Sequence, residues 1–439
     1  MVWERESAAI LLGVSDDDRI ERWRSVAAAT GLVADDGSTR PTIFAEMSAL
    51  AARTGAANLG QGFPDEDGPE WIREAAVAAI RGGANQYPPG LGELALREAV
   101  AAHQARHYGI DLDPEREILI TAGATEALTA AILALAGPGD EVVTLEPFYD
   151  SHAAAIAMAG ARHVTVSLMP TPSGFRLDLE SLRAAVSPRT RVILVNSPHN
   201  PTGTVLGRDE LLAIAAEAQR VDAVIVTDEV YERLTFDGAE HIPMATLPGM
   251  RERTLTVSSA GKSFSLTGWK IGWISGPEQL VRAALAIKQF LTYSGGAPFQ
   301  PAIARALAEG DVDVDALRES LSARRELLLD GLSRAGFEVV RPAGTYFICA
   351  DASPFVDGER ADASPFLDGH MRDGAAFARA LPELAGVACV PLSAFCRTGS
   401  PTAQALSNWV RFTFVKDEAT LRTAVDRLVG LRGSTRHSG

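Results

Sequence analysis

Lysine is scarce in this sequence, and two of its positions suggest a reactive amine. The chain of 439 residues has 41 lysines and arginines, but lysine stands only at Lys262, Lys270, Lys288 and Lys416. Two of these lie in SSAGKSFSLTGWKIGW (258–273), among small and hydroxyl side chains. An amine that is desolvated in such surroundings loses its charge and becomes a nucleophile toward an aldehyde. The alternative is a pair of solvated surface lysines, which a sequence that otherwise uses arginine does not favour.

Polar residues also stand at the ends of two apolar strands. In TDEVY, Asp228 ends an apolar run and Tyr231 follows three residues later. A carboxylate at the end of a buried strand needs a cationic or proton-bearing partner, because an unpaired buried charge is costly. In NSPHNPTG, two prolines fix a turn that presents the amide of Asn200. A helix N-cap at Asp228 and a plain proline-rich turn remain the structural alternatives.

A third strand end has the form of a phosphate site. In ITAGATEAL, a strand passes through Gly123 into a helix, and the free amides near Ala124 and Thr125 together with the helix dipole favour an anion. Alone, this motif fits an ordinary βα turn equally well. Combined with the lysine, the carboxylate, the phenol and the amide, it completes the set of groups that pyridoxal phosphate requires.

The elements that must position these residues follow a regular rhythm. From Glu117 to about Pro277, short apolar strands alternate with segments of helix length, which predicts an α/β fold with a mostly parallel central sheet flanked by helices. Ligand sites in such sheets lie at the carboxyl ends of the strands. After about Gly310, charge-rich helices and shorter strands predict a smaller α+β domain. We expect an N-terminal arm (1–43), a segment contributing to the small domain and the active site (44–80), a large coenzyme-binding domain (81–310) and a small C-terminal domain (311–439).

Composition and charge exclude several classes of partner. The formal net charge of -15 argues against nucleic acid and anionic membrane surfaces, and no apolar stretch approaches the length of a membrane span. The start of the chain, MVWERESAAILLGVSDDDRIERW, fits neither a secretory signal nor a transit peptide. The three cysteines form no CxxC pair and the histidines form no HExxH motif, so we expect no metal site. A cytoplasmic enzyme is the expectation.

One short repeat carries no chemistry. The segment DASPFVDG, which begins at Asp351, recurs as DASPFLDG at Asp362. Two copies are too few for a solenoid, so we interpret the repeat as a duplicated surface loop.

From about Phe44 to Leu428, the chain resembles a fold-type I pyridoxal-phosphate enzyme of the class I/II aminotransferase family. Within that family it is similar to kynurenine aminotransferases, which are also cysteine-conjugate β-lyases, and to N-succinyldiaminopimelate aminotransferases. The motifs that carry the resemblance are NLGQGFPDEDGP, NQYPPG, TAGATEA, EPFYDSH, NSPHNPTG, TDEVYE, SSAGKSFSLTGWKIGW, GTYF and WVRFTFVKDEATL.

The resemblance implies roles for individual residues. Lys262 would form the Schiff base with the coenzyme and move a proton, and Asp228 would pair with the pyridine nitrogen. Asn200 and Tyr231 would bond the 3-oxygen of the ring, and Tyr149 would lie against its face. The phosphate would be held by Ala124, Thr125, Ser259 and Lys270, with Tyr87 reaching it from the neighbouring subunit of a homodimer. The substrate would contact Gly62, Phe44, Asn200 and Arg411, whose guanidinium suits a carboxylate.

Three functions are consistent with this pattern to different degrees. The leading hypothesis is amino transfer between an L-amino acid and a 2-oxo acid. A C-S β-lyase acting on a cysteine S-conjugate, or a decarboxylating deaminase, would use the same residues, and the sequence does not separate these reactions. A regulator that retains the fold would need a basic DNA-binding segment, whereas the arm before residue 40 is acidic.

Overall fold

The computed structural model describes residues 22–433, apart from positions 35, 172 and 357–370. Its largest element is an eight-stranded sheet in the order β2-β9-β8-β7-β6-β3-β4-β5. The pairs β7–β8, β6–β7, β3–β6 and β3–β4 are parallel, whereas β2, β9 and β5 pair antiparallel at the two edges. The mostly parallel sheet predicted from the sequence is therefore confirmed. The strands are β2 (Ile118–Thr121), β3 (Glu141–Glu146), β4 (Arg162–Thr171), β5 (Gly174–Leu177), β6 (Thr190–Asn196), β7 (Val224–Asp228), β8 (Thr254–Ser259) and β9 (Gly272–Ser275).

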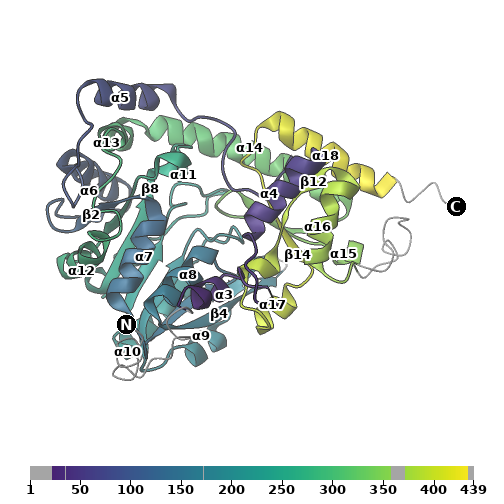
Figure 1. Cartoon of the computed structure of the whole chain (residues 1–439), viewed down its shortest axis with the longest axis horizontal. Coiled ribbons are helices and arrows are strands. Elements are labelled where there is room, and N and C mark those ends of the chain that lie inside the picture. Colours follow the sequence, from purple (N-terminus) through teal and green to yellow (C-terminus); the bar gives the residue numbers. More distant parts are fainter. Residues whose placement is uncertain (1–21, 35, 172, 357–370, 434–439) are drawn as a thin grey trace, which may run out of the picture.

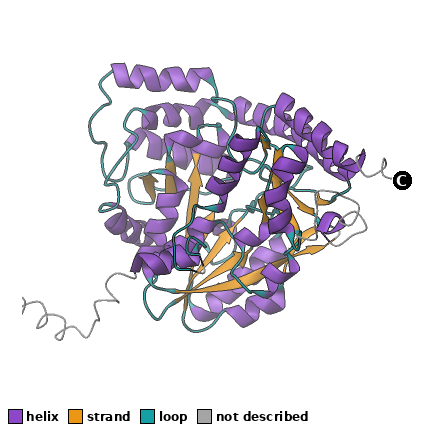
Figure 2. Ribbon diagram, turned by 45° about the vertical axis from the view of Figure 1, so that its right-hand side comes forward, coloured by secondary structure: helices purple, strands orange, loops and turns teal. Residues whose placement is uncertain are grey.

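Helices cover both faces of this sheet (Figures 1 and 2). Along β6, Val192 and Leu194 pack into one apolar cluster, while Ile193 and Val195 pack into another on the opposite face. Successive side chains of a strand point to opposite faces, so a strand buried on both sides is apolar throughout. The surrounding helices are α6 (Leu94–Tyr108), α7 (Gly123–Leu135), α8 (Asp150–Ala159), α9 (Leu179–Ala185), α10 (Arg208–Val221), α12 (Glu278–Lys288) and α13 (Phe299–Glu309).

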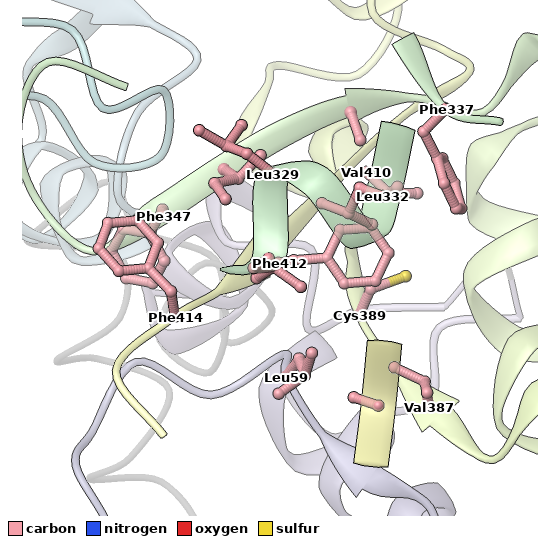
Figure 3. Close-up of a cluster of buried hydrophobic side chains, with 14 of the residues drawn as sticks. Leu59, Leu329, Leu332, Phe337, Phe347, Val387, Cys389, Val410, Phe412 and Phe414 are labelled. Carbon is pink, nitrogen blue, oxygen red and sulfur yellow. The ribbon is translucent and has the colours of Figure 1, made fainter. Parts of the chain in front are cut away.

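A second, smaller sheet lies to the right in Figure 1. Its strands run antiparallel in the order β10-β11-β14-β13, and a short pair, β1 with β12, lies beside it. Figure 3 shows its core, where Leu329, Phe337, Phe412 and Phe414 are buried together. The elements are β1 (Ala57–Asn58), β10 (Glu338–Val340), β11 (Phe347–Asp351), β12 (Val387–Ala388), β13 (Val390–Pro391), β14 (Trp409–Thr413), α14 (Asp311–Ala335), α16 (Gly374–Ala385) and α18 (Glu418–Gly433).

The N-terminal segments connect the two sheets. Helix α3 (Arg22–Ala29) packs against α8 beside the large sheet, and α4 (Ile43–Thr54) packs against α16 beside the small one. Helix α5 (Glu70–Arg81) packs against α13. The chain therefore crosses between both parts of the molecule before it enters the large sheet. In the part of the chain that the structure describes, no helix is long and apolar enough to cross a membrane.

The first copy of the DASPF repeat differs from the predicted surface loop. Asp351 ends β11, and the next residues form the helical turn α15 (Ser353–Val356). Phe355 is buried with its ring 4.6 Å from that of Phe337. The interpretation as a surface loop is wrong for this copy, because its apolar side chains complete the small core. The second copy lies outside the described residues.

The remaining helical turns are short. They are α11 (Ala260–Ser263), α17 (Pro401–Ala405), η1 (Met244–Thr246), η2 (Arg251–Arg253), η3 (Thr267–Trp269) and η4 (Leu392–Phe395).

Candidate active site

A cavity of about 410 Å³ opens at the carboxyl ends of the parallel strands, between the two sheets. This volume suits a small ligand. Except for Tyr87, the residues predicted for the site all line it, although they come from segments spread over most of the chain. They are Phe44, Gly62, Ala124, Thr125, Tyr149, Asn200, Asp228, Tyr231, Ser259, Lys262, Lys270 and Arg411.

The end of β7 presents a fixed carboxylate. Asp228 is 5% exposed, and its Oδ2 lies 3.2 Å from Nε2 of His152. The side chain of Asn196, at the end of the neighbouring β6, donates to the backbone oxygen of Asp228 at 2.8 Å. Asn196 Oδ1 also accepts a hydrogen bond from the amide of Asn200 at 2.8 Å. One asparagine thus ties the proline-rich turn to the strand that carries the carboxylate.

The first turn of α7 forms an anion cradle. A Cβ atom on Gly272 would lie 2.7 Å from the carbonyl carbon of Gly123, so β9 approaches this turn more closely than another residue type would permit. Lys270 lies across the turn, and a Cβ on Gly123 would meet its Nζ at 3.2 Å. Partial desolvation, together with the charge of Lys262, lowers the pKa of Lys270. Two amines beside free helix amides define a site for a group with multiple negative charges.

The amine of Lys262 lies between two phenol rings. Its Nζ donates to Oη of Tyr346 at 2.8 Å and lies 5.5 Å from the ring centroid of Tyr231. Burial raises the pKa of Tyr231 well above the ordinary tyrosine value, which keeps this phenol protonated. Burial also raises the pKa of Tyr149 to about 12.

Arg411 stands at the opposite wall of the cavity. It is 1% exposed and comes from β14 of the small sheet. Its Nη1 donates to Oδ1 of Asn200 at 2.9 Å, and its Nη2 donates to the carbonyl oxygen of Gly60 at 2.8 Å. Burial lowers the pKa of this guanidinium to about 10, so it still carries a positive charge at neutral pH. The ring of Phe347 stacks under it at 3.9 Å.

A second cavity of about 390 Å³ shares Phe44 with the first. Phe44 meets Phe395 edge to face at 5.8 Å, and Arg411 lies over both rings. The second cavity lies between the end of α3, the start of α4 and the loop after β13. Three of its lining residues are cationic, namely Arg40, Arg379 and Arg397.

Tyr87 is the predicted residue that the fold does not bring into the cavity. Its side chain is 81% exposed and makes an edge-to-face contact with Tyr293 at 5.7 Å. The prediction places Tyr87 in the site of a neighbouring subunit, so its position in one chain does not test that prediction.

Sequence reasoning missed several residues of the site, among them Phe347 under Arg411, His152 and Tyr346. His152 lies in EPFYDSH and Tyr346 in GTYF, so both belong to motifs that carried the resemblance, but neither received a role. A histidine two residues after a helix start, or a tyrosine before a strand, has an ordinary structural explanation. Their contacts with Asp228 and Lys262 span 76 and 84 residues, which local spacing does not reveal.

The comparisons with known proteins identify one family of enzymes. The family model for aminotransferase class I and II matches residues 54–428. The chain is 54% identical over 391 residues to a probable N-succinyldiaminopimelate aminotransferase of Mycobacterium tuberculosis, covering 88% of this chain and 95% of the relative. It is 38% identical to the kynurenine–oxoglutarate transaminase of Dictyostelium discoideum, covering 89% and 94%.

Solved structures give the same result. The structure of the N-succinyldiaminopimelate aminotransferase from Mycobacterium tuberculosis superposes with a TM-score of 0.83, covering 89% of this chain and 97% of that one. A methionine aminotransferase from Escherichia coli, 38% identical, superposes with a TM-score of 0.81, covering 89% and 97%. These three enzyme names all describe amino transfer, and none of them describes a lyase.

The chain belongs to the class I and II aminotransferases, which are fold-type I enzymes that use pyridoxal 5′-phosphate. Its substrates are accordingly an amino acid and a 2-oxo acid. The residues present fit the coenzyme, because one cavity joins a cationic cradle for a phosphate to a buried carboxylate for a pyridinium and an amine for an aldehyde.

Proposed function

We propose that this chain exchanges the amino group of an L-amino acid with a 2-oxo acid in the cavity where Lys262, Asp228 and Arg411 meet. The observation that carries the proposal is their convergence from three separate elements, α11, β7 and β14. When bound, the coenzyme supplies an aldehyde that accepts amino groups and a ring that accepts electrons.

Each residue then has a defined task. Lys262 would hold the coenzyme at its aldehyde and, as a free amine, would move the proton at the substrate α-carbon. Asp228 would keep the pyridine nitrogen protonated, while Asn200 and Tyr231 would donate to the ring oxygen. Tyr149 would lie against the ring face. The phosphate would be held by Ala124, Thr125, Ser259 and Lys270.

The substrate is bound on the other side of the cavity. The guanidinium of Arg411 pairs with the α-carboxylate, a planar group that its fork of donors matches. Gly62 would let the substrate approach the backbone closely. Packing also requires a glycine there, since a Cβ would lie 2.6 Å from the ring of Phe347. Phe44 forms a wall for the substrate side chain.

The decisive experiment replaces the amine. We expect Lys262→Ala to lose the visible absorption band of the lysine-bound coenzyme and the amino transfer. The matched control is Lys270→Ala, which removes the other amine of the cavity. This control should keep the band at saturating coenzyme but bind the coenzyme more weakly. A Lys262→Ala enzyme that retains both band and activity would refute the assignment.

We further propose an amino acid with an anionic distal group as the substrate. The relative at 54% identity is named for N-succinyldiaminopimelate, and the cavity beside Phe44 has three arginines. Arg379 pairs with Glu46 at 2.6 Å, whereas among the described residues no ion pair reaches the guanidinium of Arg397. Arg397 is thus available to a distal carboxylate.

The assembly we propose is a homodimer with shared active sites. The exposed apolar side chains of Tyr87, Phe290, Leu291 and Tyr293 support it, because exposed apolar side chains favour contact with another chain. Tyr87 and Tyr293 lie in contact with each other. In a dimer, Tyr87 would reach the phosphate of the partner subunit. Phe290→Glu should yield monomers in analytical ultracentrifugation, and unchanged dimers would argue against this surface.

The division of the chain and its compartment complete the proposal. We propose an arm (1–43), a bridging segment (44–80), a large coenzyme-binding domain (81–310) and a small domain (311–439), which limited proteolysis would test. The two sheets support this division. The three cysteines are free thiols, which suits a reducing cytoplasm.

A further inference from the structure

The hydroxyl of Tyr346 forms a two-step hydrogen-bond chain through the site. Lys262 Nζ lies 2.8 Å from Tyr346 Oη, and this oxygen lies 2.6 Å from the carbonyl oxygen of Gly62. A carbonyl only accepts, so the phenol proton is committed to Gly62. The oxygen of Tyr346 is therefore left to accept one N–H of Lys262, whether that amine is neutral or charged.

The backbone before Tyr346 is held in an unusual conformation. Thr345 has φ +63°, in the left-handed region that a β-branched residue rarely adopts. Its amide donates to the carbonyl of Leu234 at 2.9 Å, and its Oγ1 accepts from the amide of Phe347 at 3.2 Å. Gly344 is required just before it, because a Cβ there would lie 2.7 Å from Cβ of Pro198. Such strain persists only where the surroundings impose it, and it is typical of functional sites.

The ring and the carbonyl of Tyr346 are fixed as well. The side chain is 2% exposed and meets Tyr231 edge to face, with centroids 5.2 Å apart and planes at 88°. Its carbonyl oxygen accepts from Oγ1 of Thr413 at 3.0 Å. The hydroxyl therefore has little freedom, and the position of the Lys262 amine is set by a rigid partner rather than by a mobile side chain.

We propose that Tyr346 is a positioning residue that holds the amine of Lys262 whenever this amine is not covalently bound, so that the nitrogen lone pair faces the substrate α-carbon. The inference rests on the proposed function of Lys262. Fixing one N–H removes rotational freedom from a group that must take up and return a proton, and a fixed geometry of this kind speeds the transfer step. The link to Gly62 places the same hydroxyl on the loop that the substrate touches.

The test is Tyr346→Phe in the holoenzyme, which keeps the ring and removes the hydroxyl. We expect kcat to fall about tenfold or more, as for the loss of one charge-assisted hydrogen bond, while the KM for the amino donor changes less than about twofold. The substrate-free enzyme gives a second readout. The rate at which the visible band forms when coenzyme is added to the apoenzyme depends on the free amine of Lys262, and the pH midpoint of this rate should shift because the hydroxyl no longer accepts from that amine.

Tyr108→Phe is the matched control. This tyrosine has a buried hydroxyl outside the cavity, and its variant should keep the wild-type kcat and midpoint. An unchanged kcat together with an unchanged midpoint in Tyr346→Phe would overturn the proposal. The proposal would also be overturned if Tyr346→Phe and Tyr108→Phe showed the same loss of kcat and the same loss of thermal stability.

Two further measurements cover the cases in which the variant does not fold or the enzyme transfers no amino group. If Tyr346→Phe does not fold, a fluorotyrosine at position 346 retains the ring and the hydroxyl but acidifies the phenol. An unchanged pH midpoint for formation of the band would then overturn the proposal. If wild-type enzyme transfers no amino group from any donor, the proposed function fails. The pH dependence of band formation from apoenzyme and coenzyme still tests the contact between Tyr346 and Lys262 in that case.

Discussion

Nε2 of His152 lies 3.2 Å from Oδ2 of Asp228, and both side chains are almost completely buried. The histidine comes from α8 and the carboxylate from the end of β7. A buried carboxylate is stable only with partners, and removing one of them leaves the desolvation cost of the other uncompensated. The histidine therefore orients the group that the coenzyme nitrogen would meet.

Replacing His152 should weaken both coenzyme binding and turnover. In His152→Ala, we expect the coenzyme dissociation constant to rise about tenfold, which corresponds to about 1.4 kcal/mol. Absorbance titration of the apoenzyme with coenzyme measures this change. His107→Gln, on a helix away from the cavity, is the control. A coenzyme affinity equal to that of the wild type would show that Asp228 does not depend on His152.

Arg411→Lys should weaken binding of the substrate more than binding of the coenzyme. A lysine provides a compact charge without the two-donor fork, and it cannot reach both Asn200 and Gly60 in the same way. We expect kcat/KM for the amino donor to fall at least about tenfold, or about 1.4 kcal/mol. Steady-state kinetics and coenzyme titration measure the two effects. Equal losses of both would mean that the role is misassigned.

Arg397→Gln should change the choice of substrate. Its guanidinium is exposed in the second cavity, so we expect its loss to raise the KM about threefold to tenfold for donors with a distal carboxylate. Methionine or another neutral donor of similar length should be unaffected. The ratio of the two kcat/KM values is the measurement, and a parallel change in both would exclude a distal subsite at Arg397.

Stability should fall as the pH drops below 6.5. Burial lowers the pKa of both His163 and His199 to about 3, against an ordinary value of 6.5. The unfolded chain therefore binds protons that the folded chain excludes, so this stability is complete above pH 6.5 and is lost as the pH falls toward 3. Each histidine contributes a slope of up to about 1.4 kcal/mol per pH unit.

Urea unfolding between pH 7 and 5 measures this slope. His199→Gln keeps a polar partner for Thr202, whose Oγ1 lies 2.8 Å from Nδ1 of His199, but it does not titrate. The variant should show a shallower loss of unfolding free energy with acidification. The same slope as in the wild type would indicate that His199 is already protonated in the folded state.

The four lysines show that amino-acid composition can identify unusual residues but does not assign their roles. Their scarcity identified Lys288 and Lys416 as unusual without explaining them. The structure buries both and satisfies each amine across long sequence distances. Lys288 donates to the carbonyl of Gly90 at 3.0 Å, and Lys416 bonds Asp65 at 2.8 Å. Each amine thus ties a loop to another part of the chain, which gives both lysines a structural role.

The sequence by itself predicted the fold class, the coenzyme and the side chains that line the cavity, because these depend on local signals. A few neighbouring residues are enough to predict the chemistry of the strand end at Asp228, of the helix start at Ala124 and of the motif around Lys262. Tertiary structure alone decided which distant groups touch them. Tyr346, just before β11, reaches Lys262 in α11. Arg411 on β14 reaches Asn200, in the turn after β6, across 211 residues. Such contacts depend on how the sheets pack together, and no local pattern encodes that geometry.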